Sequence, residues 1–307
     1  MTAVVDSRLE LAEGVAARAA AFTSFDELAR SGRRIDVVHV CTPSASHAEL
    51  VQSAIALGAN VVVEKPVAPD AATTIALVRA ASERGVALVP VHQFLFQPGV
   101  QRILAARERL GVLVRCVFHA TSAGSELTGV APDELVAEIL PHPLALFARL
   151  ATVPVSDLQW TVTRPDAGEL RAISAAGGAT FEIVISARAR PTRAQLEVFG
   201  TRCSAFADLF HGFAVFEPGR VTPVRKATRP FTVAGSTIVR AGANLAVRAS
   251  RQETAYPGLR TLVRLVYRSI VTGSPPPISA EETIAVAQAR DAILTDAAAP
   301  APARTPP

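Results

Sequence analysis

Lys65 is the residue whose type and setting could most directly do chemistry, in the segment Val61-Val62-Val63-Glu64-Lys65-Pro66. The 307-residue chain has only two lysines, Lys65 and Lys226, against 29 arginines. Arg stays charged under ordinary conditions, whereas the Lys ammonium is compact and readily tuned by burial. A Lys kept at the end of an apolar run is suited to donate a proton or to place a charge beside a reacting oxygen. The alternative is a lysine that extends its ammonium into water from a strand end.

Glu138 and His142 form a second candidate pair, four residues apart. At that spacing both side chains would lie on one face of a helix. A carboxylate beside an imidazole can orient the ring and raise its pKa, which gives a general acid or base near neutral pH. The alternative is a helix start in which Glu138 interacts with the helix dipole and His142 packs in the core.

Two βα units must position Lys65. Residues 35–41 and 61–63 are β-branched apolar runs typical of strands buried on both faces, and residues 86–91 predict a third. Helices are expected over 46–57 and from the capping Asp70 through Val78. Alternating strands and helices predict a parallel, doubly wound sheet, which binds ligands beyond the carboxyl ends of its strands. The residues expected at those ends are Thr42, Pro43, His47, Glu64, Lys65, His92 and Gln93.

The motifs resemble the glucose–fructose oxidoreductase / inositol dehydrogenase / MocA (Gfo/Idh/MocA) family. They are Cys-Thr-Pro-Ser-Ala-Ser-His at 41–47, Val-Glu-Lys-Pro at 63–66 and Val-His-Gln-Phe-Leu-Phe-Gln-Pro at 91–98. The likeness continues through residues 110–115, 138–143, 199–202 and 255–277, and so covers nearly the whole chain. Glu-Lys-Pro after a strand is fairly specific, whereas the other motifs are informative mainly through their order.

The resemblance implies an NAD(P)-dependent oxidoreductase with a homo-oligomer interface on its C-terminal sheet. It implies catalytic roles for Lys65, His142 and Glu138. It implies cofactor contacts from Asp6, Thr42, Pro43, His47, Glu64, Lys65, His92 and Gln93. His47 is also typical of a helix-cap or core residue. Two positions depart from the family pattern: Glu138 replaces an Asp, and Ala145 stands where a second Asp is expected.

The amino terminus is the part of the sequence that departs most from the family pattern. Family members open with a strand and a G-x-G-x-x-G turn whose backbone approaches the cofactor pyrophosphate, and the sequence has no such run. Residues 1–6 resemble the second strand of the family, with Asp6 as the ribose-binding acid or, alternatively, a helix cap. A helix is expected over 10–19. The absent strand would be central, leaving unpaired backbone groups on both neighbours. A misplaced start, a genuine loss of cofactor binding and a strand from a partner chain are the competing explanations.

The predicted fold class is α/β, with an N-terminally truncated Rossmann-like parallel sheet over 1–95. A second α+β domain with a mostly antiparallel open sheet is expected over 96–296, and a disordered tail over 297–307. After a helix over 99–110, strands are expected at 112–120, 158–163, 180–187, 195–199 and 204–210. Basic clusters at 188–193 and 220–229 are interpreted as solvated hairpins, with phosphate binding as the alternative.

Composition excludes several classes. Aromatic residues make up 5% of the chain and the net charge is +4, without the basic stripe of a nucleic-acid-binding protein. Cys41, Cys116 and Cys203 are isolated in apolar runs, which favours buried thiols over disulfides or a metal site. No signal peptide or long apolar span is visible, so we expect a cytoplasmic protein.

Two enzyme classes stay open. One is an NAD(P)-dependent oxidoreductase of a sugar, cyclitol or similar hydroxy or keto compound. The other is a redox-silent enzyme that uses the same cleft, Lys65 and His142 for a cyclisation, elimination or decarboxylation. A non-catalytic binding subunit is a third possibility. In either enzyme we expect Lys65 and His142 to face one cleft.

Overall fold

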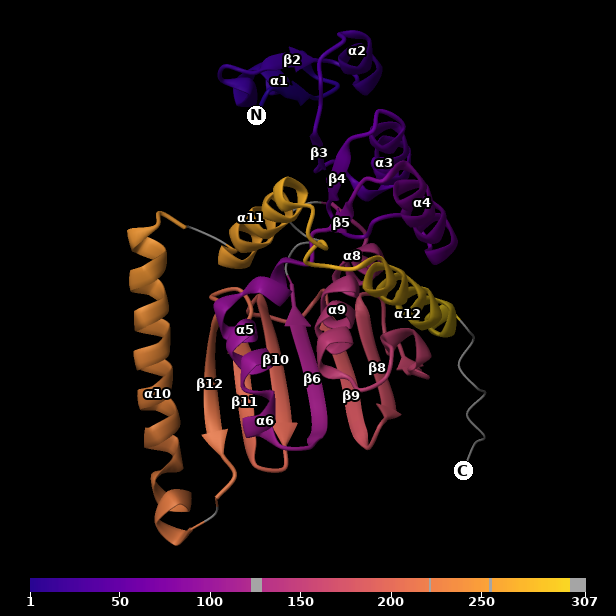
Figure 1. Cartoon of the computed structure of the whole chain (residues 1–307). Helices are drawn as coiled ribbons and strands as arrows, with labels where there is room; N and C mark the ends of the chain where they lie inside the picture. The colour runs from indigo at the N-terminus through magenta and orange to yellow at the C-terminus, as the bar shows by residue number, and fades with distance from the viewer. Residues whose placement is uncertain (123–128, 221, 254–255, 299–307) are drawn as a thin grey trace. The chain divides into compact units, whose positions relative to one another are not determined.

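The computed structural model describes residues 1–122, 129–220, 222–253 and 256–298. The chain divides into two units, Met1–Pro90 and Val91–Pro307 (Figure 1). The limits at 95 and 296 remain predictions. The expected tail at 297–307 lies outside the described residues apart from its first two positions, which end the last helix.

The first unit contains the predicted parallel sheet. Its strands β3 (Val37–Val40), β4 (Asn60–Val63) and β5 (Leu88–Pro90) pair in that order, all parallel. The three valines of β4 are almost fully buried, as expected for a central parallel strand. Crossover helices α3 (His47–Ala56) and α4 (Ala71–Arg84) join the strands, with the short helix η1 (Ser44–Ser46) before α3. Asp70 caps α4, accepting from the Thr73 N–H at 2.7 Å, and the helix continues beyond Val78 to the left-handed Gly85.

A separate two-stranded sheet precedes it. Strand β1 (Ala3–Val5) pairs in parallel with β2 (Ala20–Phe22), flanked by α1 (Leu9–Ala16) and α2 (Phe25–Arg30). The helix expected over 10–19 ends earlier, because Ala17 has a positive φ of 51°. β2 and α2 were not predicted. Among the described residues, neither strand of this sheet pairs with β3, β4 or β5.

The second unit is built on a seven-stranded sheet in the order β12-β11-β10-β6-β9-β8-β7. Every neighbouring pair is antiparallel except β6 and β9, which are parallel. The strands are β6 (Leu113–Thr121), β7 (Thr161–Thr163), β8 (Glu169–Ala176), β9 (Ala179–Ser186), β10 (Arg193–Gly200), β11 (Cys203–Asp208) and β12 (Phe213–Pro218). The mostly antiparallel sheet was predicted, but β8 and β12 were not.

Alternation along these strands separates a buried face from an open one. Phe181 is buried against Phe147 of α9, with 5.3 Å between ring centroids, and Phe118 is buried on the same face because it pairs with Ile183, two residues after Phe181. Helices α5, α6 and α9 lie over one face of this sheet (Figure 1). On the opposite face Glu182 of β9 forms ion pairs with Arg115 of β6 and Arg171 of β8, each at 2.7 Å. The two arginine side chains are about half exposed, at 51% and 54%, so solvent reaches this face.

The remaining helices are η2 (Gln93–Phe96), α5 (Pro98–Ala105), α6 (Arg107–Leu110), α8 (Pro132–Ile139), α9 (Pro141–Leu150), η3 (Val155–Asp157), α10 (Pro223–Ser250), α11 (Pro257–Thr272) and α12 (Ala280–Ala298). The hairpin predicted over 220–229 is wrong, because Thr222 caps the start of α10 and its hydroxyl accepts from the Arg225 N–H. No helix in the described part of the chain is long and apolar enough to span a membrane.

Two of the three cysteines are buried as expected, Cys116 and Cys203. The prediction for Cys41 is wrong: β3 ends at Val40, and Cys41 is exposed just beyond it. In the described ranges no three His, Cys, Asp or Glu side chains are grouped as metal ligands.

Candidate functional site

The carboxyl ends of β3 and β4 bring four predicted site residues to one edge of the first unit's sheet. Thr42 and Pro43 follow β3 and are exposed, while Glu64 and Lys65 follow β4 and are half-buried. The two strand ends are held together because the Glu64 N–H donates to the Val40 carbonyl at 2.9 Å. This edge is where a doubly wound sheet presents ligand-binding side chains.

His47 links the chain segments that follow β3 and β4 through hydrogen bonds to both. Its ring is 1% exposed, with Nδ1 2.7 Å from the Pro66 carbonyl oxygen and Nε2 2.8 Å from the Thr42 carbonyl oxygen. A neutral imidazole can donate only one of these hydrogen bonds, whereas the doubly protonated ring donates both. His47 therefore fixes the backbone on which Lys65 and Thr42 stand. The cofactor contact expected for His47 remains a prediction.

Glu64 has a carboxyl group with a raised pKa at this edge. Burial raises its pKa above the usual 4.5, and the charges of Lys65 and His47 oppose that shift without cancelling it. The group is therefore poised to carry a proton at a higher pH than an exposed Glu would.

Asp6 follows β1, as expected for the ribose-binding position. Its Oδ1 accepts from the Arg8 N–H at 2.9 Å, and the Asp6 N–H donates to the Phe22 carbonyl of β2. The bond from the Arg8 N–H to the Asp6 carboxylate closes a turn ahead of α1. The first helical residue is Leu9, and the N-cap residue is Arg8, not Asp6.

His142 is buried at the start of α9, and its ring lies against Phe94 of η2 with 4.4 Å between ring centroids. The contact brings the 91–98 motif, with His92 and Gln93, beside the predicted catalytic His. His92 is 3% exposed and Gln93 is half-buried.

Glu138 and His142 do not share one continuous helix as predicted. α8 ends at Ile139 and α9 begins at Pro141, whose nitrogen has no hydrogen to donate to the Ala137 carbonyl. Arg290 of α12 satisfies that carbonyl instead, with its Nε 3.2 Å away. A hydrogen bond between Glu138 and His142 remains a prediction.

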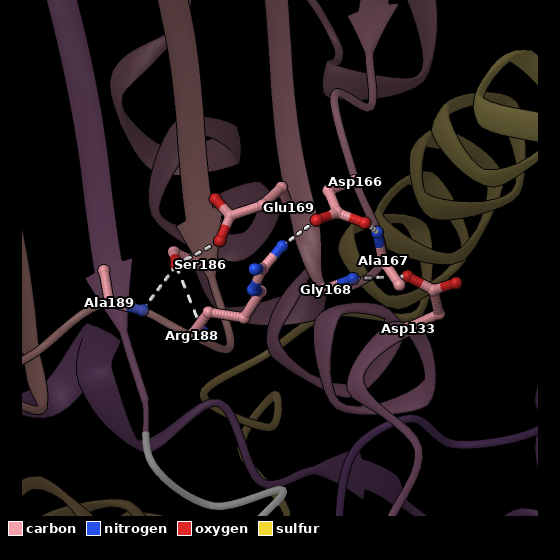
Figure 2. A network of polar contacts seen from close by, with 8 residues as sticks. All are labelled: Asp133, Asp166, Ala167, Gly168, Glu169, Ser186, Arg188 and Ala189. Carbon is pink, nitrogen blue, oxygen red and sulfur yellow. Dashed lines mark hydrogen bonds and ion pairs between the residues drawn. The ribbon is translucent and has the colours of Figure 1, made fainter.

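A polar network fixes the start of α8, the helix that carries Glu138 (Figure 2). The Asp133 carboxylate accepts from the Gly168 N–H at 2.7 Å and pairs with Arg164 at 2.5 Å. In the same network Asp166 pairs with Arg188. The Ser186 hydroxyl donates to Glu169 at 2.6 Å and accepts the N–H groups of residues 188 and 189. Arg188, one of the proposed phosphate-binding arginines, is therefore held by a carboxylate.

Sequence reasoning missed the packing that holds η2 in place. The buried Gln97 donates from Nε2 to the Leu209 carbonyl at 3.0 Å. A Cβ on Gly258 of α11 would lie 2.2 Å from the Gln93 carbonyl oxygen, so only glycine permits this approach. Gln97 belongs to the 91–98 motif, but a role that depends on a residue more than 100 positions away leaves no local signal.

The predicted site residues thus form two groups. Asp6, Thr42, Pro43, His47, Glu64 and Lys65 belong to the first unit, and His92, Gln93, Glu138 and His142 to the second. Their joint action on one substrate remains a prediction.

Comparison with solved structures matches nearly the whole chain. WlbA from Bordetella pertussis, in complex with NADH and UDP-GlcNAcA, is 18% identical with a TM-score of 0.74, covering 97% of this chain and 87% of that one. The UDP-N-acetylglucosamine 3-dehydrogenase GnnA from Acidithiobacillus ferrooxidans is 18% identical with a TM-score of 0.71, covering 97% and 89%. The 3-ketoreductase KijD10 from Actinomadura kijaniata, in complex with NADP and TDP-benzene, gives the same values.

The TM-scores show a shared fold, and at 18% identity these matches show the fold alone. Comparison with curated protein sequences gave no match. The model of the Gfo/Idh/MocA oxidoreductase family, described as an NAD-binding Rossmann fold, matches residues 1–92. Those residues include Thr42, His47, Glu64 and Lys65, and their parallel sheet agrees with that description. Residues 1–92 are therefore a Rossmann domain of the Gfo/Idh/MocA oxidoreductase family.

Proposed function

We propose that the protein is an NAD(P)-dependent oxidoreductase that interconverts a hydroxyl and a keto group on a nucleotide-linked sugar. The observation that carries this proposal is the setting of Lys65. It stands half-buried at the carboxyl end of a central parallel strand, and His47 fixes the carbonyl of the next residue. The substrate class is taken from WlbA, GnnA and KijD10, whose names and bound molecules include UDP- and TDP-linked compounds.

Lys65 and His142 divide the acid and base chemistry. In the direction of oxidation, the substrate hydroxyl loses its proton to a protein base while the hydrogen on the same carbon leaves as hydride. Lys65 stabilises the charge that develops on that oxygen, and His142 exchanges the proton. Glu138 orients the imidazole and supports its protonated form. A bound nicotinamide cofactor accepts or supplies the hydride.

The chain's residues fit such a cofactor in part. Asp6 after β1 matches the acidic residue that binds the adenosine ribose, and Thr42 and Pro43 line the edge where the cofactor would lie. β1 and β3 end separate sheets, and a strand between them would unite both into one doubly wound sheet. We propose that a strand with a Gly-rich turn, added at this place, would complete a cofactor site.

The open face of the second unit's sheet is the proposed homodimer interface. Its exposed Arg115 and Arg171 are locked to Glu182, which makes a rigid, polar surface. Such a surface can pair with its own copy about a twofold axis.

Steady-state reduction of NAD or NADP with UDP- and TDP-sugars tests the assignment, measured on the chain with a Gly-rich βα unit joined ahead of Met1. Lys65→Arg keeps the charge but loses the compact donor, and it should abolish turnover in a folded protein. His142→Ala should slow the chemical step by roughly 10²–10⁴-fold, and Glu138→Gln by less. Lys65→Arg turnover within about tenfold of wild type, a tenth of the smallest loss expected for an acid or base group, would overturn the role of Lys65.

The second candidate is a redox-silent enzyme using the same residues for acid and base work. Acid and base work needs Lys65 and His142, both of which the 307-residue sequence contains, and does not need a G-x-G-x-x-G run. Conversion of a keto-sugar without any change in nicotinamide absorbance, abolished by Lys65→Arg, would select this class.

A further inference from the structure

Helix α10 presents a large apolar surface to solvent. It has 28 residues, so it is about 40 Å long, and none of its residues is buried. The exposed fractions of Val224, Phe231, Ile238 and Leu245 are 71%, 79%, 73% and 65%. The helix runs beside β12 at the edge of the seven-stranded sheet (Figure 1).

Polar anchors fix which face of α10 points outward. Arg229 forms a two-pronged ion pair with Glu217 of β12, at 2.6 and 3.2 Å. Near the other end, the Asn244 side chain donates to the His211 carbonyl. Thr237 lies between these anchors and is half-buried. The helix is therefore held by one side, and the apolar residues lie on another.

The outward apolar face repeats every seven residues. Large residues stand at 224, 231, 238 and 245, and small ones four positions after each, at Thr228, Gly235, Gly242 and Ala249. These are the two seam positions of a heptad repeat. A Cβ placed on Gly235 or Gly242 would meet no atom within 4 Å, so nothing in the described chain occupies the space beside these glycines.

We propose that this seam pairs antiparallel with the same seam of a second copy of the chain. With the twofold axis between residues 236 and 237, every large side chain faces a small one. Phe231 then lies over Gly242 of the partner subunit, and Ile238 over Gly235 of the partner subunit. Val224 meets Ala249 of the partner subunit, and Leu245 meets Thr228 of the partner subunit. Such a self-complementary contact closes as a dimer interface, distinct from the sheet face proposed above.

The charge pattern fits a second copy. α10 has no acidic residue and five basic ones, yet none of the eight seam residues is charged. Arg225 and Arg248 lie on opposite sides of the seam, so Arg225 does not face Arg248 of the partner subunit, although the two are level along the helix axes in this register. The neighbours of Arg225 and Arg248 across the seam are Ala246 and Ala227 of the partner subunit. Like charges are therefore kept apart.

The glycines distinguish this partner from an anionic lipid surface, which a basic amphipathic helix can also bind. Gly contributes no apolar area to a membrane and costs about 1 kcal/mol in a helix interior. Two glycines at seam positions are useful where a second backbone approaches closely.

Analytical ultracentrifugation of the full chain tests the pairing. Ile238→Glu places a buried charge in the seam on both copies and should weaken self-association at least about 100-fold. Ser236→Glu adds the same charge two residues away, outside the seam, and should associate like wild type. An Ile238→Glu protein with the wild-type dissociation constant would overturn the proposal.

Gly242→Leu distinguishes the two candidate partners of the seam, a second copy of the chain and an anionic lipid surface. It adds apolar surface and helix propensity, so it would strengthen binding to anionic phosphatidylserine vesicles. It also fills the space that Phe231 of the partner subunit needs, so it should weaken self-association. Unchanged self-association together with tighter vesicle binding would overturn the proposed pairing and would identify a lipid surface as the partner of the seam.

Cysteine cross-linking tests the direction of the helices, in a Cys41→Ser background that removes the exposed thiol. Ile238→Cys lies beside the twofold axis and should give a disulfide-linked dimer on mild oxidation. Val224→Cys, equally exposed in the monomer, would lie about 35–40 Å from its own copy and should not. Equal cross-linking of both variants would overturn the antiparallel arrangement.

Discussion

At the scale of single residues, backbone carbonyls organise the candidate site. His47 binds the carbonyl oxygens of Thr42 and Pro66, and Arg290 binds that of Ala137. None of these three carbonyls would carry chemistry itself. The bonds to Pro66 and Ala137 fix the stretches of backbone that carry Lys65 and His142, and the bond to Thr42 fixes the chain just beyond β3. A site needs such support to hold its geometry.

Gly258→Ala should damage the second unit. Its new Cβ would lie 2.2 Å from the Gln93 carbonyl oxygen and 2.9 Å from the Gln97 nitrogen, so α11 or η2 must move. We expect a loss of about 1–3 kcal/mol or more in unfolding free energy, measured by chemical denaturation. The control is Gly14→Ala in α1, where no atom lies within 4 Å and a small gain is expected. Equal unfolding midpoints for both variants would contradict this packing.

Glu64→Gln should stabilise the protein, and increasingly so at higher pH. Burial raises the Glu64 pKa in the folded chain, so folded Glu64 retains its proton more strongly than unfolded Glu64 does. Stability is therefore lost as pH rises from the usual 4.5 through the raised value. Gln mimics the protonated form and avoids that loss. Thermal unfolding between pH 4.5 and 8 checks this, and a gain that is largest at low pH would show the sign to be wrong.

At the scale of elements, sequence patterns predicted the helices and strands whose structure depends on residues close to them in the chain. The valines of β4 and the Asp70 cap specify their elements through near neighbours, and the structure confirms both. α10 was missed because Pro230, Gly235 and Gly242 have poor helix propensity and its apolar face is not in a core. β2 has only three residues, Ala20–Phe22, which is too short for an alternating pattern.

The sheet order was beyond the sequence because it depends on distant pairs. β6 lies between β9 and β10, parallel to the first and antiparallel to the second. The prediction that Glu138 and His142 share one continuous helix was wrong because Pro141 interrupts it. The four-residue spacing on which that prediction rested takes no account of a proline between the two residues. The candidate site residues could be chosen from their types and motifs. The carbonyl groups that bind His47 and Arg290 could not be, because those hydrogen bonds depend on the folded arrangement of distant segments.

Glu182→Gln should weaken the second unit's sheet at neutral pH. Burial alone would raise the pKa of Glu182, but hydrogen bonds and charge from Arg115 and Arg171 outweigh it and lower the pKa. The carboxylate thus contributes stability above its usual pKa of 4.5, which is lost as pH falls through the lowered value. We expect a loss of about 1.5–3 kcal/mol at pH 7 that shrinks in acid.

Urea unfolding at pH 7 and pH 3.5 measures this difference. Glu197→Gln, on β10 of the same sheet, is the control for removing a half-buried carboxylate. An effect of Glu182→Gln that is independent of pH would contradict the ionic origin of the stabilisation.

At the scale of the whole molecule, the first unit has two separate parallel sheets and the sequence has no G-x-G-x-x-G run to hold a cofactor pyrophosphate. We predict that the 307-residue chain binds NAD and NADP weakly or not at all. Grafting a βα unit with a G-x-G-x-x-G turn ahead of Met1 should create binding. At 100 times the dissociation constant, cofactor would then stabilise the fold by about 2.7 kcal/mol.

Calorimetric titration and thermal shift check this prediction on both chains. Asp6→Ala in the grafted chain should reduce the shift, because the ribose loses its acidic partner. A low-micromolar dissociation constant for the 307-residue chain itself would show that the cradle is not required.

The Arg290–Ala137 hydrogen bond also sets an order of events during synthesis. The two residues are 153 positions apart, and Arg149 of α9 likewise pairs with Glu282 of α12 at 2.7 Å. A nascent chain that has emerged only as far as β12 has the proline-broken junction before His142 but not the arginine that completes it. At about 5–20 residues per second, that arginine follows Ala137 by roughly 8–30 seconds. The ribosome therefore delivers His142 long before the arginine that supports the backbone ahead of it, and this junction is complete only after α12 has emerged.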